Sequence, residues 1–274
     1  MPLGQEEIVN EQKQRIVVKV GTSTLTHSSG SLNLRSMEQL VRVLSDLSGA
    51  GHEIILVTSG AIAVGTARMG LDERPRALRM KQAAAAVGQC RMMHIYDKLF
   101  SEYNHVTAQI LLTREDVDNP VRKQNLQNTF HRLLEMNILP IVNENDSVAT
   151  EEIEAGGSFG DNDTLSAVVS VLIEADLLIL LSDIDGLYTD NPRTNPDAQL
   201  IPCVDRLTPE IEAMASGAGS ARGTGGMVTK IRAAQLAVSH GVEMLILNGA
   251  NPNDLYRLLD GEEVGTWFMA PHND

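Results

Sequence analysis

Short, continuously apolar runs alternate along the chain with longer segments whose apolar residues recur at helical spacing. The apolar runs occupy residues 15–20, 53–57, 105–112, 138–143, 177–182 and 242–247. A strand with one solvated face alternates apolar and polar residues, whereas a strand covered on both faces is apolar throughout. We therefore predict buried strands at these six positions.

The intervening segments are typical of amphipathic helices. Helices are expected at residues 36–48, 76–103, 121–136, 163–175, 208–216, 227–240 and 252–260. In the first of them Met37, Leu40 and Leu44 fall on one face behind Ser36-x-x-Gln39, which has the form of a capping box. Strands and helices that alternate in this way predict an α/β fold, a three-layer αβα sandwich with a mostly parallel central sheet.

Small and polar residues follow most of the predicted strands. They are Gly21-Thr22-Ser23, Thr58-Ser59-Gly60-Ala61, Asn143-Glu144-Asn145-Asp146, Ser182-Asp183 and Asn248-Gly249. Turn chemistry alone explains one or two such groups. The carboxyl ends of parallel strands share one edge of the sheet, and ligands of open α/β sheets bind there. The repetition therefore predicts a functional edge.

Composition and charge narrow the function classes. The 274 residues are 43% hydrophobic and 21% charged, as in an ordinary globular protein, and we expect one domain over residues 15–269 between a flexible N-terminus (1–14) and a C-terminal tail (270–274). The net charge of −14 argues against nucleic acid or an anionic membrane as the partner. Cys90 and Cys203 are the only cysteines, which favours a reducing compartment, and we expect a cytoplasmic protein. The seven histidines lack metal-ligand spacing, so no metal site of the protein's own is predicted.

Residues 219–230 form a glycine-rich run that ends in Lys230 and leads into a predicted helix. A glycine-rich loop at a helix start offers backbone N–H groups and the positive end of the helix dipole, which suits a phosphate. The run is not a P-loop, because Ile231 rather than Ser or Thr follows the lysine. A flexible surface loop is the alternative interpretation.

Lys19 lies inside an apolar strand, two residues before Gly21. A lysine buried there without a partner would be strongly unfavourable, so it either reaches solvent at a sheet edge or is held for a ligand. Asp161, Asn162 and Asp163 stand before a clean apolar helix pattern. Asp163 is a candidate N-cap, and equally a candidate partner for lysines. Asn143, Asn145 and Asp146 form a second polar group, able to accept the ammonium group of a small substrate.

Six motifs, in order along the chain, resemble the amino-acid kinase family, and in particular its glutamate-phosphorylating branch. They are Lys19-Val-Gly21-Thr22, Val57-Thr-Ser-Gly-Ala61, Val142-Asn-Glu-Asn-Asp146, Phe159-Gly-Asp-Asn-Asp163, Leu181-Ser-Asp-Ile-Asp-Gly-Leu-Tyr188 and Gly223-Thr-Gly-Gly-Met-Val-Thr-Lys230. The resemblance runs from about Arg15 to Phe268. Many members carry a further C-terminal domain, and this chain ends about where that domain would begin.

The resemblance implies phosphorylation of the γ-carboxylate of L-glutamate by ATP with Mg²⁺, the first step of proline biosynthesis. It implies that Lys19, Asp163 and Lys230 are catalytic, with Asp163 positioning the two lysines. Ser59, Asn145, Asp146 and Asn162 would bind glutamate, and Lys19, Gly21, Ser182, Asp183, Thr224, Gly225, Gly226, Met227 and Lys230 would bind the nucleotide. It further implies a homo-oligomer and proline as feedback inhibitor.

Two other functions stay open on sequence alone. Another family member, such as an N-acetylglutamate, carbamate or uridylate kinase, would keep the phosphoryl site and change residues 143–162, where the acceptor is read. A non-catalytic amino-acid sensor would be free to lose Lys19, Asp163 or Lys230, and all three are present.

Overall fold

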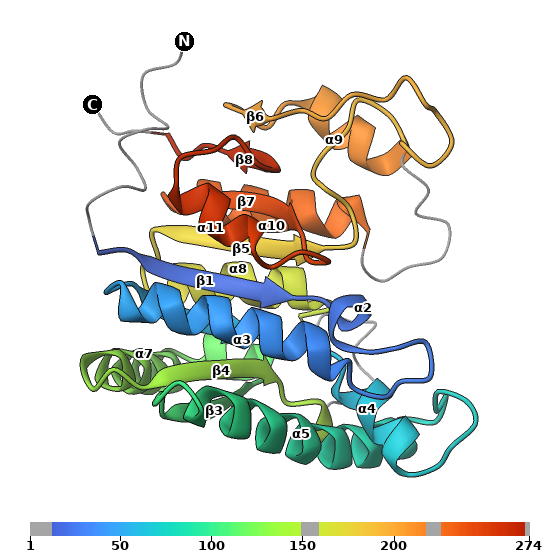
Figure 1. Ribbon diagram of the computed structural model, residues 1–274, viewed down its shortest axis with the longest axis vertical. Coiled ribbons are helices and arrows are strands. Elements are labelled where there is room, and N and C mark those ends of the chain that lie inside the picture. The colour runs from blue at the N-terminus through green and yellow to red at the C-terminus, as the bar shows by residue number, and fades with distance from the viewer. Residues whose placement is uncertain (1–12, 149–158, 218–225, 272–274) are drawn as a thin grey trace.

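An eight-stranded sheet runs through the centre of the computed structural model, which describes residues 13–148, 159–217 and 226–271 (Figure 1). The strands, in the order in which they lie side by side, are β3 (Thr107–Leu112), β4 (Leu139–Glu144), β2 (Glu53–Val57), β1 (Arg15–Val20), β5 (Leu177–Ser182), β7 (Glu243–Asn248), β8 (Thr266–Phe268) and β6 (Cys203–Val204). Neighbouring strands are parallel except for β7 and β8, which are antiparallel. The carboxyl ends of β1, β2, β4 and β5 therefore meet at one edge.

Helices cover both faces of this sheet, so the predicted three-layer α/β fold is confirmed. One face packs against α2 (Thr22–Leu25), α3 (Leu34–Gly49), α4 (Ala61–Arg68), α5 (Leu78–Ser101) and α11 (Asp254–Leu259). The other packs against α6 (Arg114–Asp118), α7 (Pro120–Glu135), α8 (Asn162–Leu172), α9 (Pro209–Gly217) and α10 (Met227–Val238). Strand β1 shows the alternation, because Ile16 and Val18 belong to the first core and Val17 to the second. Lys19 shares the face of Val17, and so points toward α8 and α10.

Three details differ from the sequence prediction. Helix α3 begins at Leu34, and Asn33 is its N-cap, whose side chain accepts a hydrogen bond from the backbone N–H of Ser36 at 3.2 Å. The capping box at Ser36 is therefore wrong, because the chain is already helical there. Helices α2, α4 and α6 and strands β6 and β8 were not predicted, since they are too short to show a period. Gln14, assigned to the flexible terminus, is buried, and its carbonyl accepts from the N–H of Glu53.

Helices α4 and α5 cross so closely that only glycine fits at the contact. A Cβ atom on Gly65 would lie 1.7 Å from the carbonyl oxygen of Ala84, and one on Gly88 would lie 1.8 Å from that of Ala61. Side-chain atoms do not approach backbone oxygens at such distances. This crossing fixes the first turn of α4 at the carboxyl edge of the sheet.

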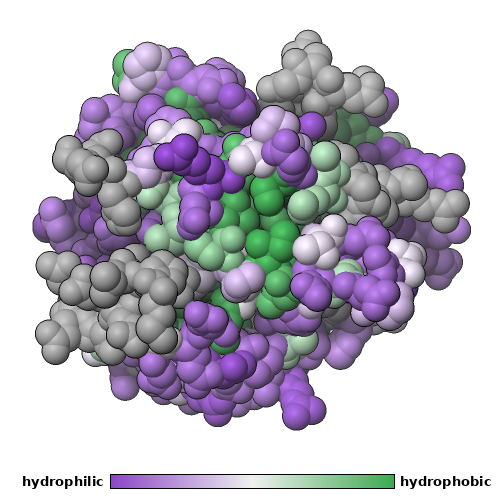
Figure 2. Space-filling view, turned by 90° about the horizontal axis from the view of Figure 1, so that it is seen from above, coloured by the Kyte–Doolittle hydropathy of each residue, from purple (hydrophilic) through white to green (hydrophobic). Residues whose placement is uncertain are grey.

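The outer surface is mainly hydrophilic when seen from the β6 end of the sheet, with a smaller hydrophobic area near the middle of that view (Figure 2). Among the helices formed by the described residues, none combines the length and the apolar character needed to cross a lipid bilayer.

Candidate active site

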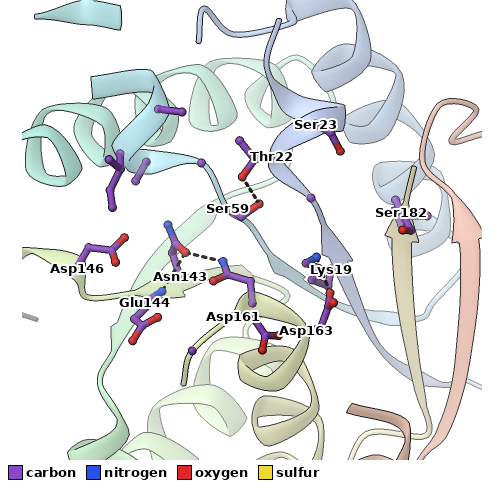
Figure 3. A pocket seen from close by; sticks show the side chains of 18 of the residues that line it. Lys19, Thr22, Ser23, Ser59, Asn143, Glu144, Asp146, Asp161, Asp163 and Ser182 are labelled. Atoms are coloured by element: carbon purple, nitrogen blue, oxygen red, sulfur yellow. Dashed lines mark hydrogen bonds and ion pairs between the residues drawn. The ribbon is translucent and has the colours of Figure 1, made fainter. Parts of the chain in front are cut away.

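A cleft of about 450 Å³ opens where β1, β2, β4 and β5 end (Figure 3). The sequence-predicted residues that line it are Lys19, Gly21, Ser59, Asp146, Asn162, Asp163, Ser182, Asp183 and Lys230. Gly226 and Met227 do not line it but begin α10, the helix that carries Lys230, whereas Thr224 and Gly225 lie outside the described residues. The polar groups that follow separate strands thus face one common cavity.

Two lysines and one aspartate form the floor of the cleft. Lys19 Nζ lies 2.6 Å from Asp163 Oδ1, and Lys230 Nζ lies 3.1 Å from Asp163 Oδ2. The hydroxyl of Thr229 donates to the same Oδ2 at 2.8 Å. All three charged residues are buried, with Asp163 only 2% exposed. The edge-strand interpretation of Lys19 is therefore wrong, because β1 lies between β2 and β5 and its lysine is paired inside the protein.

Asp163 is not the N-cap of its helix. Asp161 takes that place and accepts a hydrogen bond from the backbone N–H of Thr164 at 2.8 Å. Asp163 follows within the first turn of α8, where its side chain points to the lysines. Burial alone raises the pKa of Asp163, but the positive charges of Lys19 and Lys230 and the hydrogen bonds that it accepts outweigh burial and lower this pKa to about 2. Asp163 is therefore ionised at neutral pH, and the three groups together carry one net positive charge.

The end of the cleft under β1 and β5 is built for close approach by a ligand. Gly21 follows β1, and a Cβ atom there would lie 3.8 Å from Lys19 Nζ. Ser182 ends β5 and is buried, and its hydroxyl donates to Asp183 at 3.4 Å. Asp183 also forms an ion pair of 3.1 Å with Arg193. The first turn of α10, which carries Lys230, adds the positive end of a twelve-residue helix to this region.

A buried hydrogen-bond network supports the middle of the cleft. The side-chain amide of Asn162 donates to the carbonyl of Thr58 and to Asn143 Oδ1, the second at 2.9 Å. Asn143 in turn donates to Gln89 of α5 at 2.9 Å. The hydroxyl of Thr58 lies 3.0 Å from that of the fully buried Tyr96. These bonds fix Asn162 from two strands and one helix.

Ser59 joins the ends of β1 and β2. Its hydroxyl donates to the carbonyl of Val20 at 2.9 Å and accepts from the hydroxyl of Thr22 at 3.2 Å. The next residue, Gly60, has φ of +95° and turns the chain into α4. Ser59 is thus held between β1 and β2, at the floor of the cleft.

The far end of the cleft, beside β4, is acidic (Figure 3). Asp146 and Glu144 both line it, together with Arg74 from the loop between α4 and α5. Burial raises the pKa of Asp146 to about 6, the negative charge of Glu144 raises it as well, and the positive charge of Arg74 partly opposes them. Asp146 is therefore a carboxylate at pH 7 that gains from a cationic partner.

Asn145 is the one described member of the predicted substrate set that does not line this cleft. Its backbone N–H donates to the carbonyl of Leu112 at 2.8 Å, and its side chain accepts from the hydroxyl of Ser147 at 2.5 Å. These bonds hold Asn145 beside β3, where it lines a neighbouring cavity with Gln109.

Several residues of the cleft were absent from the predicted site. They include Thr22, Ser23, Gly60, Arg74 and Glu144. Thr22, Ser23, Gly60 and Glu144 belong to the small and polar groups that the sequence placed at the strand ends, although no role was assigned to them. Arg74 stands in an irregular polar loop far from any strand end, where no sequence pattern marks it.

The described residues contain no group of three His, Cys, Asp or Glu side chains placed to hold a metal ion. The cleft instead joins a cationic floor to an acidic end. Paired ammonium groups in a partly buried site stabilise negative charge that develops on oxygen, and they act without taking a proton. The geometry is therefore suited to transfer between two anions.

Comparison with known proteins shows which family the chain resembles. The model of the amino acid kinase family matches residues 14–248. The glutamate 5-kinase of Clostridium perfringens is 55% identical over 260 residues, which is 95% of this chain and 97% of the relative. That of Listeria innocua is 51% identical, over 95% and 94%. That of Moorella thermoacetica is 54% identical over 94% of this chain but 67% of its own, longer chain.

Solved structures agree on the fold. An isopentenyl phosphate kinase of T. acidophilum superposes with a TM-score of 0.63 at 17% identity, over 93% of this chain and 99% of its own. A UMP kinase from Ureaplasma parvum gives 0.62 at 15% identity, over 94% and 100%. The chain belongs to the amino acid kinase family and, within it, to the glutamate 5-kinases.

Proposed function

We propose that this protein transfers the γ-phosphoryl group of ATP to the γ-carboxylate of L-glutamate and so forms L-glutamyl 5-phosphate, the first step of proline biosynthesis. The observation that carries the proposal is the pairing of Lys19 and Lys230 through one buried carboxylate, Asp163, at the centre of a cleft whose far end is acidic. The high identity to glutamate 5-kinases over nearly the whole chain supports the same function.

The chemistry needs no general base, because the attacking γ-carboxylate is already ionised at neutral pH. The obstacle is the approach of two anions, so the site must align them and offset their charge. Lys19 from β1 and Lys230 from α10 would contact the phosphoryl oxygens from two sides. Asp163 is a positioning residue, since it holds both ammonium groups. Lys230 would lie near the β–γ bridge, where negative charge grows as ADP leaves.

The nucleotide would bind at the β5 end of the cleft. Ser182 and Asp183 would hold it on one side, and Gly21 would let its phosphates approach Lys19. The run from Thr224 through Gly225, Gly226 and Met227 to Lys230 would cover the phosphates. Mg²⁺ usually binds through phosphate oxygens with only one or two carboxylates. In this proposal the ion arrives with ATP and offsets phosphate charge.

Glutamate would lie between the lysines and the acidic end. Its γ-carboxylate would face Lys19 and Lys230, and its α-ammonium group would meet Asp146. Ser59 and Asn162 would contact the chain between these ends. Asn145 was expected in this set. It lines the neighbouring cavity, next to Asp146, and in this proposal it would support the turn that carries Asp146.

A test measures ADP release with Mg-ATP and one acceptor at a time, subtracting the rate without acceptor. The panel is glutamate, aspartate, N-acetylglutamate, carbamate and uridylate. We expect kcat/KM for glutamate to exceed that for N-acetylglutamate by about 100-fold or more, because acetylation removes the charge that Asp146 would pair with. Equal or better turnover of N-acetylglutamate would refute the assignment. ADP release with no acceptor above the background rate would instead favour a sensor.

Three further properties belong to the proposal. Proline shares an α-carboxylate and a cationic nitrogen with glutamate, so it would compete at the Asp146 end. We also propose a homo-oligomer and a cytoplasmic location. Proline competition would be refuted if saturating proline left the initial rates at low glutamate unchanged. The homo-oligomer would be refuted if the protein sedimented as a monomer at micromolar concentration.

A further inference from the structure

Arg74 is a cation of the cleft that the phosphoryl site does not use. Lys19 and Lys230 both pair with Asp163, whereas Arg74 forms no ion pair or hydrogen bond with any residue in the ranges 13–148, 159–217 and 226–271. It projects from the loop between α4 and α5 and lines the cleft at the end where Asp146 lies. Its charge reaches Asp146, since it is one of the groups that set the pKa of that residue.

An amino-acid acceptor presents two opposite charges at this end of the cleft. Once its side-chain carboxylate faces the lysines, its α-ammonium and α-carboxylate groups remain to be bound. Asp146 supplies the negative partner for the first, and a guanidinium is the side chain best shaped to bind a carboxylate through two parallel hydrogen bonds. The first turn of α4, residues 61–63, lines the same wall and adds the positive end of a helix.

We propose that Arg74 binds the α-carboxylate of the acceptor and, with Asp146, forms a pair of opposite charges that recognises the zwitterionic end of an α-amino acid. This inference rests on the proposed function and makes Arg74 a specificity-determining residue. Its exposure in the apo structure suits the role, because a side chain outside the core can move onto the ligand. The inference also explains why a loop between two helices belongs to the active site.

The test compares Arg74→Gln and Arg74→Lys with the wild type on two acceptors. One is L-glutamate, and the other is L-isoglutamine, in which an amide replaces the α-carboxylate and the γ-carboxylate is kept. For the Gln variant we expect KM for glutamate to rise about 10- to 100-fold, the scale of one lost charge-assisted contact, while kcat and KM for ATP change little. The Lys variant should recover part of the loss. KM for isoglutamine should be high in the wild type and unchanged in both variants.

Arg76→Gln is the matched control, since Arg76 is an exposed arginine of the same loop that does not line the cleft. Its kinetics should equal those of the wild type. An unchanged KM for glutamate in Arg74→Gln would overturn the inference, and so would an equal rise for glutamate and isoglutamine. A wild type that fails to phosphorylate glutamate at all would instead refute the proposed function. Equal thermal midpoints of the variants would exclude unfolding as the cause.

Discussion

Replacement of Asp163 by Asn tests whether this carboxylate is the counter-ion that holds the two lysines together. Asn has nearly the same shape, so packing is preserved while the negative charge is lost. Two ammonium groups, 2.6 and 3.1 Å from the carboxylate in the wild type, would then face each other without it. The hydroxyl of Thr229 could still donate its hydrogen bond, now to the amide oxygen of Asn at position 163.

Two estimates give the size of the effect. The pKa of Asp163 falls from 3.8 to about 2, and at about 1.4 kcal/mol per unit its surroundings favour the charged form by roughly 2.5 kcal/mol. Removal of one partner from a buried ion pair costs about 3–5 kcal/mol. For a domain of this size each kcal/mol corresponds to about 2–4 °C, so the midpoint should fall by roughly 5–20 °C. Because the pKa of Asp163 is lowered in the folded protein, its stabilisation of the fold is complete above about pH 4 and is lost as pH falls toward 2. The difference in unfolding midpoint between wild type and Asp163→Asn should therefore be constant between pH 6 and 8.

The assay is thermal unfolding of the apo protein, with Asp161→Asn as control. Asp161 caps the same helix, and Asn is an equally good cap, so that midpoint should stay within about 2 °C of the wild type. The double variant Lys19→Met/Asp163→Asn removes one of the two repelling charges and should be more stable than Asp163→Asn alone. A double variant that is less stable than Asp163→Asn, or an unchanged midpoint in the single variant, would refute the counter-ion role.

Three other outcomes follow from the same structure. Lys230→Met should lower kcat by about 100-fold or more with a smaller change in KM, because its contact strengthens as ADP leaves, and near-normal kcat would contradict this role. Burial raises the pKa of Asp146 to about 6, so kcat/KM for glutamate should fall as pH drops through 6, because the protonated carboxyl no longer holds the α-ammonium group. A pH profile that is flat from pH 7 to 5, or an acid limb that is unchanged in Asp146→Asn, would contradict this role. In denaturant unfolding, Gly65→Ala should destabilise the protein by about 2 kcal/mol or more, because its Cβ would overlap the backbone of α5. The control Gly49→Ala has open space around it and should be neutral or stabilising. Equal effects of the two substitutions would contradict the close crossing.

The fold follows from the sequence because most of its strands are buried on both faces. The edge strand β3 is an exception, since only two of its six residues are buried. Runs such as 177–182 are apolar up to their last residue, Ser182, so length and apolar character were sufficient to place them, and β5 spans the predicted residues. Helix α4 was missed because it is short, and because Gly65, which the crossing with α5 requires, further weakens its helical pattern. The start of α3 was misplaced because two candidate caps, Asn33 and Ser36, stand within one turn.

The cleft residues that the sequence identified most clearly are those whose residue type is unusual at their position. Lys19 stands out because a charge inside an apolar strand needs a partner, and Asp163 is that partner. Arg74 could not be found in this way, since an arginine in a polar loop is ordinary and only the packing of α4 on α5 brings it to the cleft. Asn145 lines the neighbouring cavity rather than the cleft, because sequence cannot resolve which way each residue of a turn points. The roles of these residues in binding and catalysis stay predictions.

The most direct measurement identifies the atom that receives the phosphoryl group. Glutamate labelled with ¹³C at the γ-carboxyl carbon is incubated with the protein and Mg-ATP in the presence of hydroxylamine, which converts an acyl phosphate into a stable hydroxamate. The account predicts one hydroxamate whose carbonyl carries the label, formed in proportion to ADP and absent from the Lys230→Met reaction on the same time scale. Label in an unmodified carboxylate beside an unlabelled hydroxamate, or ADP release without any hydroxamate, would contradict transfer to the γ-carboxylate at the lysine pair.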